Sequence, residues 1–122
     1  MKQELFDRVN IIAQIIHDKS GFNILALDLK DISSVTDCVI IAEANVNRHA
    51  KAIVDEIKEK FKEKPYRIEG LEEGEWVVID YLDIVIHIFL PDLRQRYQLE
   101  TLWKGSKVID LKLETTSSFT ST

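Results

Sequence analysis

Residues 76–89 read Trp-Val-Val-Ile-Asp-Tyr-Leu-Asp-Ile-Val-Ile-His-Ile-Phe, and this stretch decides the fold of the chain. Residues 76–80 and 84–89 are rich in β-branched side chains and contain no glycine or proline, which is typical of strands. The link between them is short, which predicts an antiparallel hairpin. Both faces of the hairpin are apolar, and a strand that is apolar on both faces needs cover on both. We therefore expect the hairpin to lie inside a layered fold.

Helical and extended patterns alternate along the rest of the chain. Helical spacing of apolar residues is found over residues 3–18, over residues 47–63 and from Pro91 to about residue 103. Shorter apolar runs predict strands over residues 23–29, 37–42 and 66–69, with a last extended piece over residues 108–113. This order predicts an α/β (α+β) fold, in which one mixed β-sheet of about five strands is flanked by three main helices.

The composition fits one globular domain. A chain of 122 residues, 45% of them hydrophobic, is long enough to build a core. We expect a single domain over residues 1–113 and a disordered tail over residues 114–122, most of which are serine or threonine. The net charge is −5, from 16 basic and 21 acidic residues, which argues against broad binding of DNA, RNA or an anionic membrane. A basic protein partner would be attracted instead.

The expected location is the cytoplasm. The single cysteine, Cys38, excludes an internal disulfide and fits a reducing compartment. No apolar run approaches the ~20 residues that span a bilayer, and the first residues lack the pattern of a signal or transit peptide.

The hairpin carries more apolar surface than three helices readily cover. If two helices pack on one face of the sheet, part of the other face stays open near the hairpin. The aromatic residues that could gather there are Trp76, Tyr81, His87, Phe89 and Tyr97, with Asp80, Asp83 and Arg94 at the rim. Such a patch is typical of a protein-binding surface. In the other interpretation, the third helix covers this face and the aromatic residues are ordinary core.

The sequence offers only fragments of catalytic or metal-binding sites. The three histidines lie on separate predicted elements, which argues against a zinc site that includes Cys38. Asp80 and Asp83 flank the hairpin turn and could suggest nucleotidyl transfer, but side chains at that spacing usually point apart. We therefore expect no catalytic residue, no metal and no cofactor.

Several short motifs are familiar when taken in order. The first half contains Thr36-Asp37-Cys38-Val39-Ile40-Ile41 and Asn47-Arg48-His49-Ala50-Lys51-Ala52-Ile53. The second half contains Trp76-Val77-Val78-Ile79-Asp80, Val85-Ile86-His87-Ile88-Phe89 and Arg94-x-x-Tyr97-x-Leu99-Glu100-x-Leu102-Trp103. Together they resemble the ribosomal silencing factor (RsfS, Iojap-related) family over roughly residues 3–104.

The resemblance implies a translation regulator that is not an enzyme. Members of the family bind the large ribosomal subunit through its fourteenth protein, here called L-fourteen, and sterically prevent the small subunit from joining. A role in large-subunit maturation is also associated with them. Their fold is related to nucleotidyltransferases but lacks the catalytic residues, and free members self-associate through the same surface, which implies a homodimer. The alternatives left open are a divergent nucleotidyltransferase-like enzyme and a large-subunit assembly factor.

The resemblance also implies a set of partner-binding residues. Trp76, Asp80, His87, Phe89, Arg94 and Tyr97 match the family motifs on or beside the expected partner surface. Tyr81 stands where the family varies, and it joins the set only because we expect it to be exposed. One departure concerns the loop after the second strand, where Glu43-Ala44 replaces the Thr-Gly of many members. Loss of that glycine removes an easy left-handed backbone position.

Overall fold

The computed structural model describes residues 2–97, 101 and 103–114. These residues form three α-helices: α1 (Gln3–Asp18), α2 (Asn47–Lys60) and α3 (Pro91–Tyr97). The same described residues form six strands: β1 (Phe22–Asp28), β2 (Cys38–Glu43), β3 (Arg67–Glu69), β4 (Trp76–Asp80), β5 (Ile84–Phe89) and β6 (Lys107–Val108). The predicted hairpin of residues 76–89 is confirmed as β4 and β5, which pair antiparallel.

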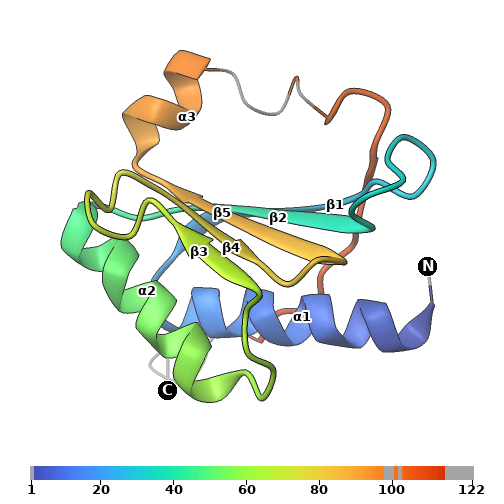
Figure 1. The fold of residues 1–122 in the computed structure, drawn as a ribbon, viewed down its shortest axis with the longest axis horizontal. Coiled ribbons are helices and arrows are strands. Elements are labelled where there is room, and N and C mark those ends of the chain that lie inside the picture. The colour runs from blue at the N-terminus through green and yellow to red at the C-terminus, as the bar shows by residue number, and fades with distance from the viewer. Residues whose placement is uncertain (1, 98–100, 102, 115–122) are drawn as a thin grey trace, which may run out of the picture.

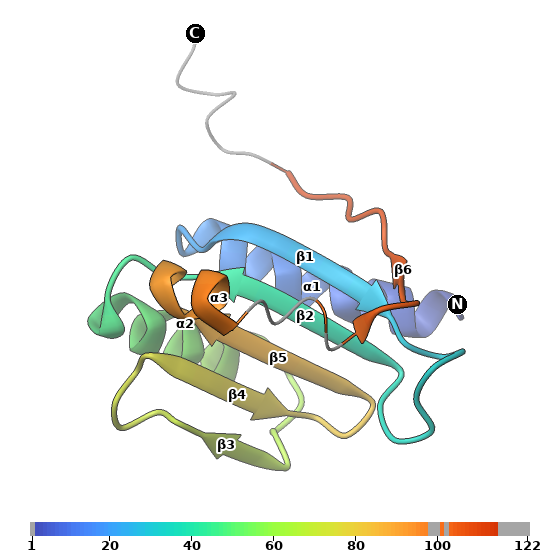
Figure 2. The same ribbon diagram turned by 90° about the horizontal axis from the view of Figure 1, so that it is seen from above.

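The strands form one mixed sheet in the order β3-β4-β5-β2-β1-β6 (Figure 2). Among the strands of the described residues, only β2 and β5 pair in parallel, with Ile40 opposite Ile86. A parallel pair cannot be joined by a tight turn, so the chain between these strands crosses over through α2. The α+β class and the mixed sheet are confirmed, with six strands where about five were expected.

The helices are distributed unequally over the two faces of the sheet. Helices α1 and α2 lie side by side under one face, and the short α3 lies over the end of the other (Figure 1). Ile12 and Ile16 of α1 and Ile53 and Ile57 of α2 are completely buried against the sheet. This side therefore holds the main hydrophobic core, and the face under α3 depends on a much smaller one.

One predicted helix boundary differs in the structure, and two further predictions fall at least partly on residues outside the described ranges. Helix α2 ends at Lys60 rather than residue 63, because Phe61 adopts an extended backbone and turns its ring into the core. The predicted extension of the third helix to about residue 103 falls partly on residues 98–100 and 102, which lie outside the described residues. The expected disorder of the tail likewise concerns residues 115–122, outside that range, whereas Glu114 is hydrogen-bonded to Gln14.

Arg8 joins three separate parts of the chain. Its guanidinium makes a forked ion pair with Glu63, just beyond α2, at 2.7 and 2.8 Å. It makes a second fork with Asp83, in the β4–β5 turn, at 2.6 and 3.1 Å. The hydrogen bonds from Arg8 lower the pKa of Asp83, and those carboxylates raise the pKa of Arg8. Because planar forked pairs are the strongest ionic contacts in proteins, Arg8 fixes the hairpin turn against the helix layer.

We predict that Arg8→Met lowers the free energy of unfolding by about 2 kcal/mol at pH 7, because it leaves two partly buried carboxylates without their donor. The pKa of Asp83 is lower in the folded state than the ordinary value of 3.8. The loss of stability in Arg8→Met should therefore be complete at pH values above 3.8, and it should shrink as the pH falls below 3.8. Urea unfolding at pH 7 and pH 3 measures both effects. Lys60→Met, which removes the cation of an exposed ion pair with Glu56, is the control and should change little. An equal loss in the two variants would contradict the prediction.

Candidate partner-binding surface

The sheet face opposite α1 and α2 is only partly covered near the hairpin. Along β4, Val77 and Ile79 point to the helices and are completely buried. The alternate residues Trp76, Val78 and Asp80 point to the other face and stay partly exposed. The same alternation continues in β5, where Val85 and His87 are partly exposed. Both interpretations left open by the sequence hold in part, because α3 covers the Phe89 end of the hairpin but not its middle.

Four rings meet on this face and form what we call the aromatic cluster, made of Trp76, His87, Phe89 and Trp103. Trp76 and Phe89 are opposite residues in the β4–β5 ladder, and their ring centres are 5.5 Å apart. His87 is 5.9 Å from Phe89 and 5.3 Å from Trp103 between ring centres. Phe89 is completely buried and forms the floor, while Trp76 and His87 remain partly exposed above it.

A hydrogen bond fixes two of these rings relative to each other. The indole Nε1–H of Trp76 donates to Nδ1 of His87 over 3.1 Å. Burial lowers the pKa of His87 to about 4, so its ring is neutral at pH 7. Because Nδ1 accepts a hydrogen bond, the neutral ring carries its own hydrogen on Nε2. The orientation of Trp76 on the surface therefore depends on the protonation state of His87.

Two hollows of different chemistry flank the aromatic cluster. One, of about 340 Å³, is bordered by His87, Trp103, Val85 and residues of the loop after β1, and the described residues that line it carry no charged side chain. The other, of about 300 Å³, lies between Trp76, Leu93 and the acidic Glu73 and Glu75. Gly70 also lines it, and a Cβ at Gly70 would come within 2.1 Å of the carbonyl oxygen of Trp76. Gly70 thus lets the acidic loop approach the cluster closely.

Helix α3 is held over this face by a nearly buried ion pair. Nη1 of Arg94 donates to Oε2 of Glu43 at 2.9 Å and to the backbone oxygen of Asn23 at 2.7 Å. The side chains of Arg94 and Glu43 are only 13% and 10% exposed. The same Glu43 oxygen accepts a hydrogen bond from Asn23 Nδ2. Glu43, which stands where the resemblance leads us to expect Thr, therefore anchors α3 to the ends of β1 and β2.

The structure brings three of the predicted site residues together and places the others apart from them. Trp76, His87 and Phe89 come together in the aromatic cluster, and Asp80 lies on the same face, where it accepts the backbone N–H of Leu82 and pairs with Arg67. Arg94 lies on α3, where it binds Glu43 and the backbone of Asn23. Tyr97 is the last residue of α3, and its side chain lies outside the described part of the structure.

The expected exposure of Tyr81 is wrong. Its side chain is 6% exposed and packs edge-on against Phe61, with ring centres 5.3 Å apart. The strand alternation accounts for this position, because Tyr81 lies on the same side as Val77 and Ile79. Its hydroxyl is buried with no hydrogen-bond partner among the described residues, and burial raises the pKa of Tyr81 to about 12. Tyr81 therefore belongs to the main core.

Trp103 and Glu43 contribute more to this surface than the sequence indicated. Trp103 contacts His87, but the end of β5 and the whole of α3 lie between them in the sequence, so no regular spacing predicts the contact. Glu43 had a usable signal, because it is an acidic residue at the end of the otherwise apolar strand β2, and all six residues of that strand are buried. A buried carboxylate needs a cationic partner.

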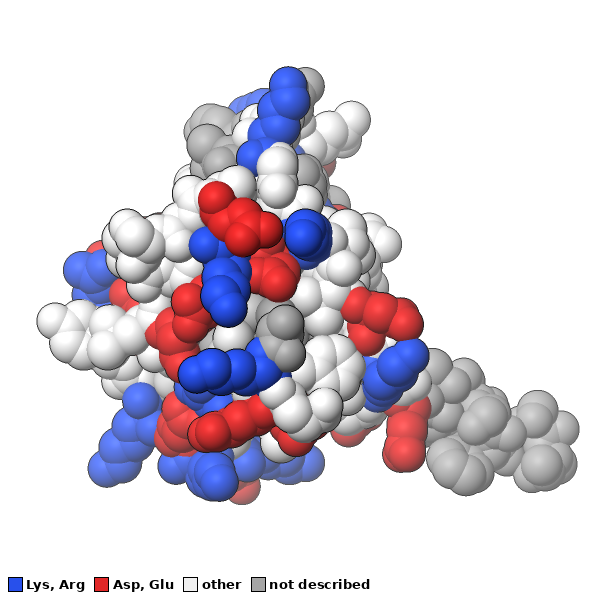
Figure 3. Space-filling view, turned by 90° about the vertical axis from the view of Figure 1, so that its right-hand side faces the viewer, with Lys and Arg blue, Asp and Glu red and all other residues white. Residues whose placement is uncertain are grey.

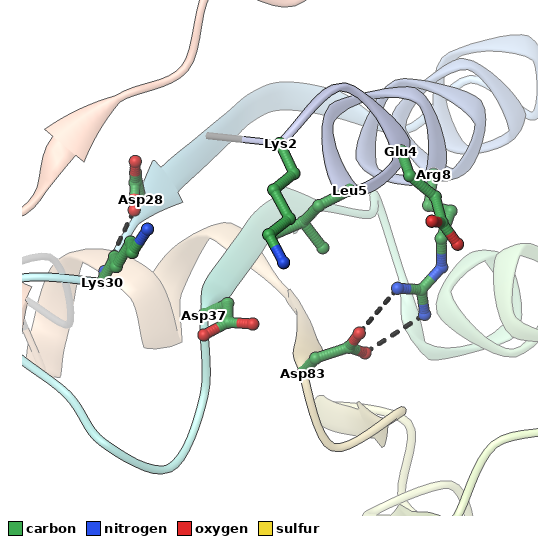
Figure 4. Close-up of a pocket in the computed structure, with 8 residues that line it drawn as sticks. All are labelled: Lys2, Glu4, Leu5, Arg8, Asp28, Lys30, Asp37 and Asp83. Carbon is green, nitrogen blue, oxygen red and sulfur yellow. Dashed lines mark hydrogen bonds and ion pairs between the residues drawn. The ribbon is translucent and has the colours of Figure 1, made fainter.

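A cavity of about 420 Å³ lies at the other end of the sheet beside the start of α1. Lys2 and Arg8 point into it from the start of the helix, and Asp37 and Asp83 point into it from just before β2 and from the β4–β5 turn (Figure 4). Asp83 is already engaged by Arg8, and no cluster of three or more metal-ligating side chains suited to an ion is found among the described residues. The acids Asp80 and Asp83 thus bind different arginines rather than converging on one site.

The surface charges are mixed rather than concentrated. On the side drawn in Figure 3, basic and acidic side chains alternate, and neither sign forms a continuous patch. None of the helices in the described ranges is long and apolar enough to cross a lipid bilayer.

These features define a small α+β domain that presents an aromatic cluster on the sheet face opposite its two long helices. The family model described as "Ribosomal silencing factor during starvation" matches residues 2–122, and this chain belongs to that family. A Bacillus subtilis protein named ribosomal silencing factor RsfS is 38% identical over 106 residues, which cover 84% of this chain and 90% of the relative. A mouse protein named mitochondrial assembly of ribosomal large subunit protein 1 is 27% identical, over 78% of this chain and 44% of its own length.

Solved structures agree with this assignment. A crystal structure of a Bacillus halodurans protein superimposes with a TM-score of 0.74 at 32% sequence identity. The superposition covers 90% of this chain and all of that one. The fold of the chain is therefore shared with an experimentally determined structure over almost its whole length.

We predict that His87 makes stability pH-dependent. The folded protein holds the ring neutral down to a pKa of about 4, whereas the unfolded chain protonates it below about 6.5. The contribution of His87 is therefore complete above pH 6.5 and is lost as the pH falls toward 4. The stability advantage of the parent over His87→Asn should shrink by on the order of 2 kcal/mol between pH 7 and pH 4.5 in urea unfolding. His17→Asn on α1 serves as the control, and an advantage that is constant with pH would contradict the assignment.

We predict that Arg94→Met costs about 3 kcal/mol, because it strands the buried carboxylate of Glu43. The double variant Glu43→Gln/Arg94→Met should be more stable than Arg94→Met alone, since the neutral amide removes the stranded charge. Chemical unfolding of Glu43→Gln, Arg94→Met and the double variant gives the coupling between the two positions. Strictly additive losses would show that the pair is not coupled.

Proposed function

We propose that this chain is a ribosomal silencing factor that binds the large ribosomal subunit through protein L-fourteen and so prevents the small subunit from joining, which represses translation. The observation that carries the proposal is the incompletely covered hairpin face with Trp76 and His87 partly exposed over a buried Phe89. Membership of the family named for ribosomal silencing supports it.

The chemistry of the face suits a basic protein. Aromatic residues that are partly exposed and rigidly held are the usual anchors of protein interfaces. Beside Trp76, Glu73 and Glu75 line an acidic hollow, and the whole chain carries a net charge of −5. Proteins that bind ribosomal RNA are rich in lysine and arginine, so their surfaces are attracted to such a face. Salt should weaken this attraction more than it weakens the apolar contact.

The proposed repression needs no catalysis. A folded chain of this length has a radius of gyration of about 14 Å, so its body is far thicker than the few ångströms over which two surfaces make contact. Once docked on the side of the large subunit that meets the small one, it would hold the two surfaces apart within its footprint. The acids that could have suggested nucleotidyl transfer are each engaged by an arginine of this chain.

Two further parts of the proposal follow from the same face. The free protein forms a homodimer through it, because an apolar patch that lacks its partner favours self-association. In the cytoplasm, the ribosome and a second copy then compete for one surface. A role in large-subunit assembly is the second candidate function, and the name of the mouse relative favours it.

We predict that Trp76→Glu abolishes the accumulation of free subunits that the parent protein causes in sucrose-gradient profiles, because a charge at the anchor opposes burial of the face. Ile11→Glu is the matched control, since it makes the same kind of change at an exposed position, 49% accessible, on α1 of the opposite layer. It should behave like the parent.

Val78→Glu tests the same face independently, in case Trp76→Glu disturbs the aromatic cluster. Binding of each variant to purified L-fourteen should follow its gradient profile. A parent protein that leaves the profile unchanged, or face variants that act like Ile11→Glu, would overturn the occlusion mechanism.

A further inference from the structure

The chain after β6 is bound along the outside of the domain in an extended form. Lys107 and Val108 pair antiparallel with Asp28 and Leu27 of β1, and the N–H of Ile109 donates to the carbonyl oxygen of Ala26 at 2.8 Å. The segment then leaves the sheet edge and runs past α1 (Figure 1). We call residues 107–114 the C-terminal arm.

Two carboxamide side chains of α1 bind the main chain of this arm. Asn10 donates from Nδ2 to the carbonyl oxygen of Lys112 at 3.0 Å and accepts the N–H of the same residue at 2.7 Å. Gln14 repeats the pattern with Glu114, at 2.8 and 2.7 Å. Each carboxamide thus exchanges a pair of hydrogen bonds with one residue of the arm, as a neighbouring strand would.

The spacing of the two carboxamides matches that of an extended chain. Four residues of an α-helix rise about 6 Å, and two residues of a strand advance about 6.6 Å. Asn10 and Gln14, one turn apart on α1, therefore lie in register with Lys112 and Glu114, two residues apart on the arm. A helix with amides at this spacing acts as a template for a strand of any sequence, because only backbone groups are bound.

The side chains of the arm supply the selectivity that backbone bonds lack. Ile109 is 9% exposed, and Leu111 packs against the main core. Leu113 is partly buried, whereas Asp110, Lys112 and Glu114 between these residues are exposed. An apolar residue at every second position, combined with main-chain pairing, is the pattern of strand addition to a sheet edge.

We propose that the β1 edge and α1 form a docking site for an extended segment with apolar residues at alternate positions, and that residues 107–114 of this chain are its resident, exchangeable occupant. In the docked state the arm shields part of the β1 edge, which would otherwise offer unpaired backbone groups to another chain. The site lies at the β1 edge and α1, whereas β4 and β3 hold the other end of the sheet. The inference is therefore independent of the proposed ribosome binding.

Hydrogen exchange on the full chain tests the docking. In Asn10→Ala/Gln14→Ala the amides of Lys112 and Glu114 should exchange at least tenfold faster than in the parent, with no change in β2 and β5. Gln3→Ala is the matched control, because the carboxamide of Gln3 donates to Asp7 of the same helix rather than to the arm, and the arm should stay protected. Unchanged protection of Lys112 and Glu114 in the double variant would overturn the assignment of the two carboxamides.

A peptide supplied in trans tests the exchange. The probe is a fluorescein-labelled peptide with the sequence of residues 106–114, Ser-Lys-Val-Ile-Asp-Leu-Lys-Leu-Glu. Full-length Ile109→Asp, which loses the anchor of its own arm, should bind the probe at least tenfold more tightly than the parent does. Adding Asn10→Ala/Gln14→Ala should remove that gain, and a peptide with the apolar residues shifted by one position should not bind.

If exchange in β2 shows that Ile109→Asp is unfolded, Lys112→Pro/Glu114→Pro replaces it. That variant removes the two N–H groups of the arm, at exposed positions, that Asn10 and Gln14 accept. It should bind the probe more tightly than the parent does, and adding Asn10→Ala/Gln14→Ala should again remove that gain. A folded arm-release variant that fails to bind the probe would overturn the proposal that the occupant is exchangeable.

Discussion

The parallel pairing of β2 and β5 is the constraint on which the rest of the structure depends. Both strands are apolar on both faces, so they must lie at the centre of a sheet with a layer on either side. Because they run parallel, the chain between them has to cross one face, and α2 makes that crossing. Helix α1 fills the space beside it, which leaves only the short α3 for the opposite face. The unequal covering of the sheet thus follows from the direction of one strand pair.

Because the two faces of the sheet are covered unequally, the polar contacts on each face have a different role. On the well-covered side, Arg8 joins helix, loop and turn through forked ion pairs and closes the edge of the main core. On the thinly covered side, the pair of Arg94 with Glu43 holds the one helix available, and the hydrogen bond from Trp76 to His87 orients the rings that remain accessible. Few groups thus determine the shape of the face that we assign to a partner.

The elements that depend on local pattern could be predicted from the sequence. The hairpin, the two long helices and the alternation that turns Trp76 and His87 to one face all follow from periodicity. That same alternation puts Tyr81 in the core, on the side of Val77 and Ile79, contrary to its expected exposure. The contact of Trp103 with His87, the Glu43–Arg94 pair and the binding of the arm by Asn10 and Gln14 could not be predicted. They join residues far apart in sequence, and only the assembled tertiary structure brings them together.

The register of the central pair also has a consequence for how the molecule is made. Cys38 is opposite Ile84, so β2 emerges during synthesis long before the strand that completes it. Closing so long a loop is slow, whereas the β1–β2 and β4–β5 pairs form between neighbours in the sequence. A nascent chain therefore carries one edge of β2 unpaired until its last third has been translated. Apolar strands whose pairing partner has not yet been synthesised are aggregation-prone. The nascent chain is therefore most susceptible to association with other chains during that interval.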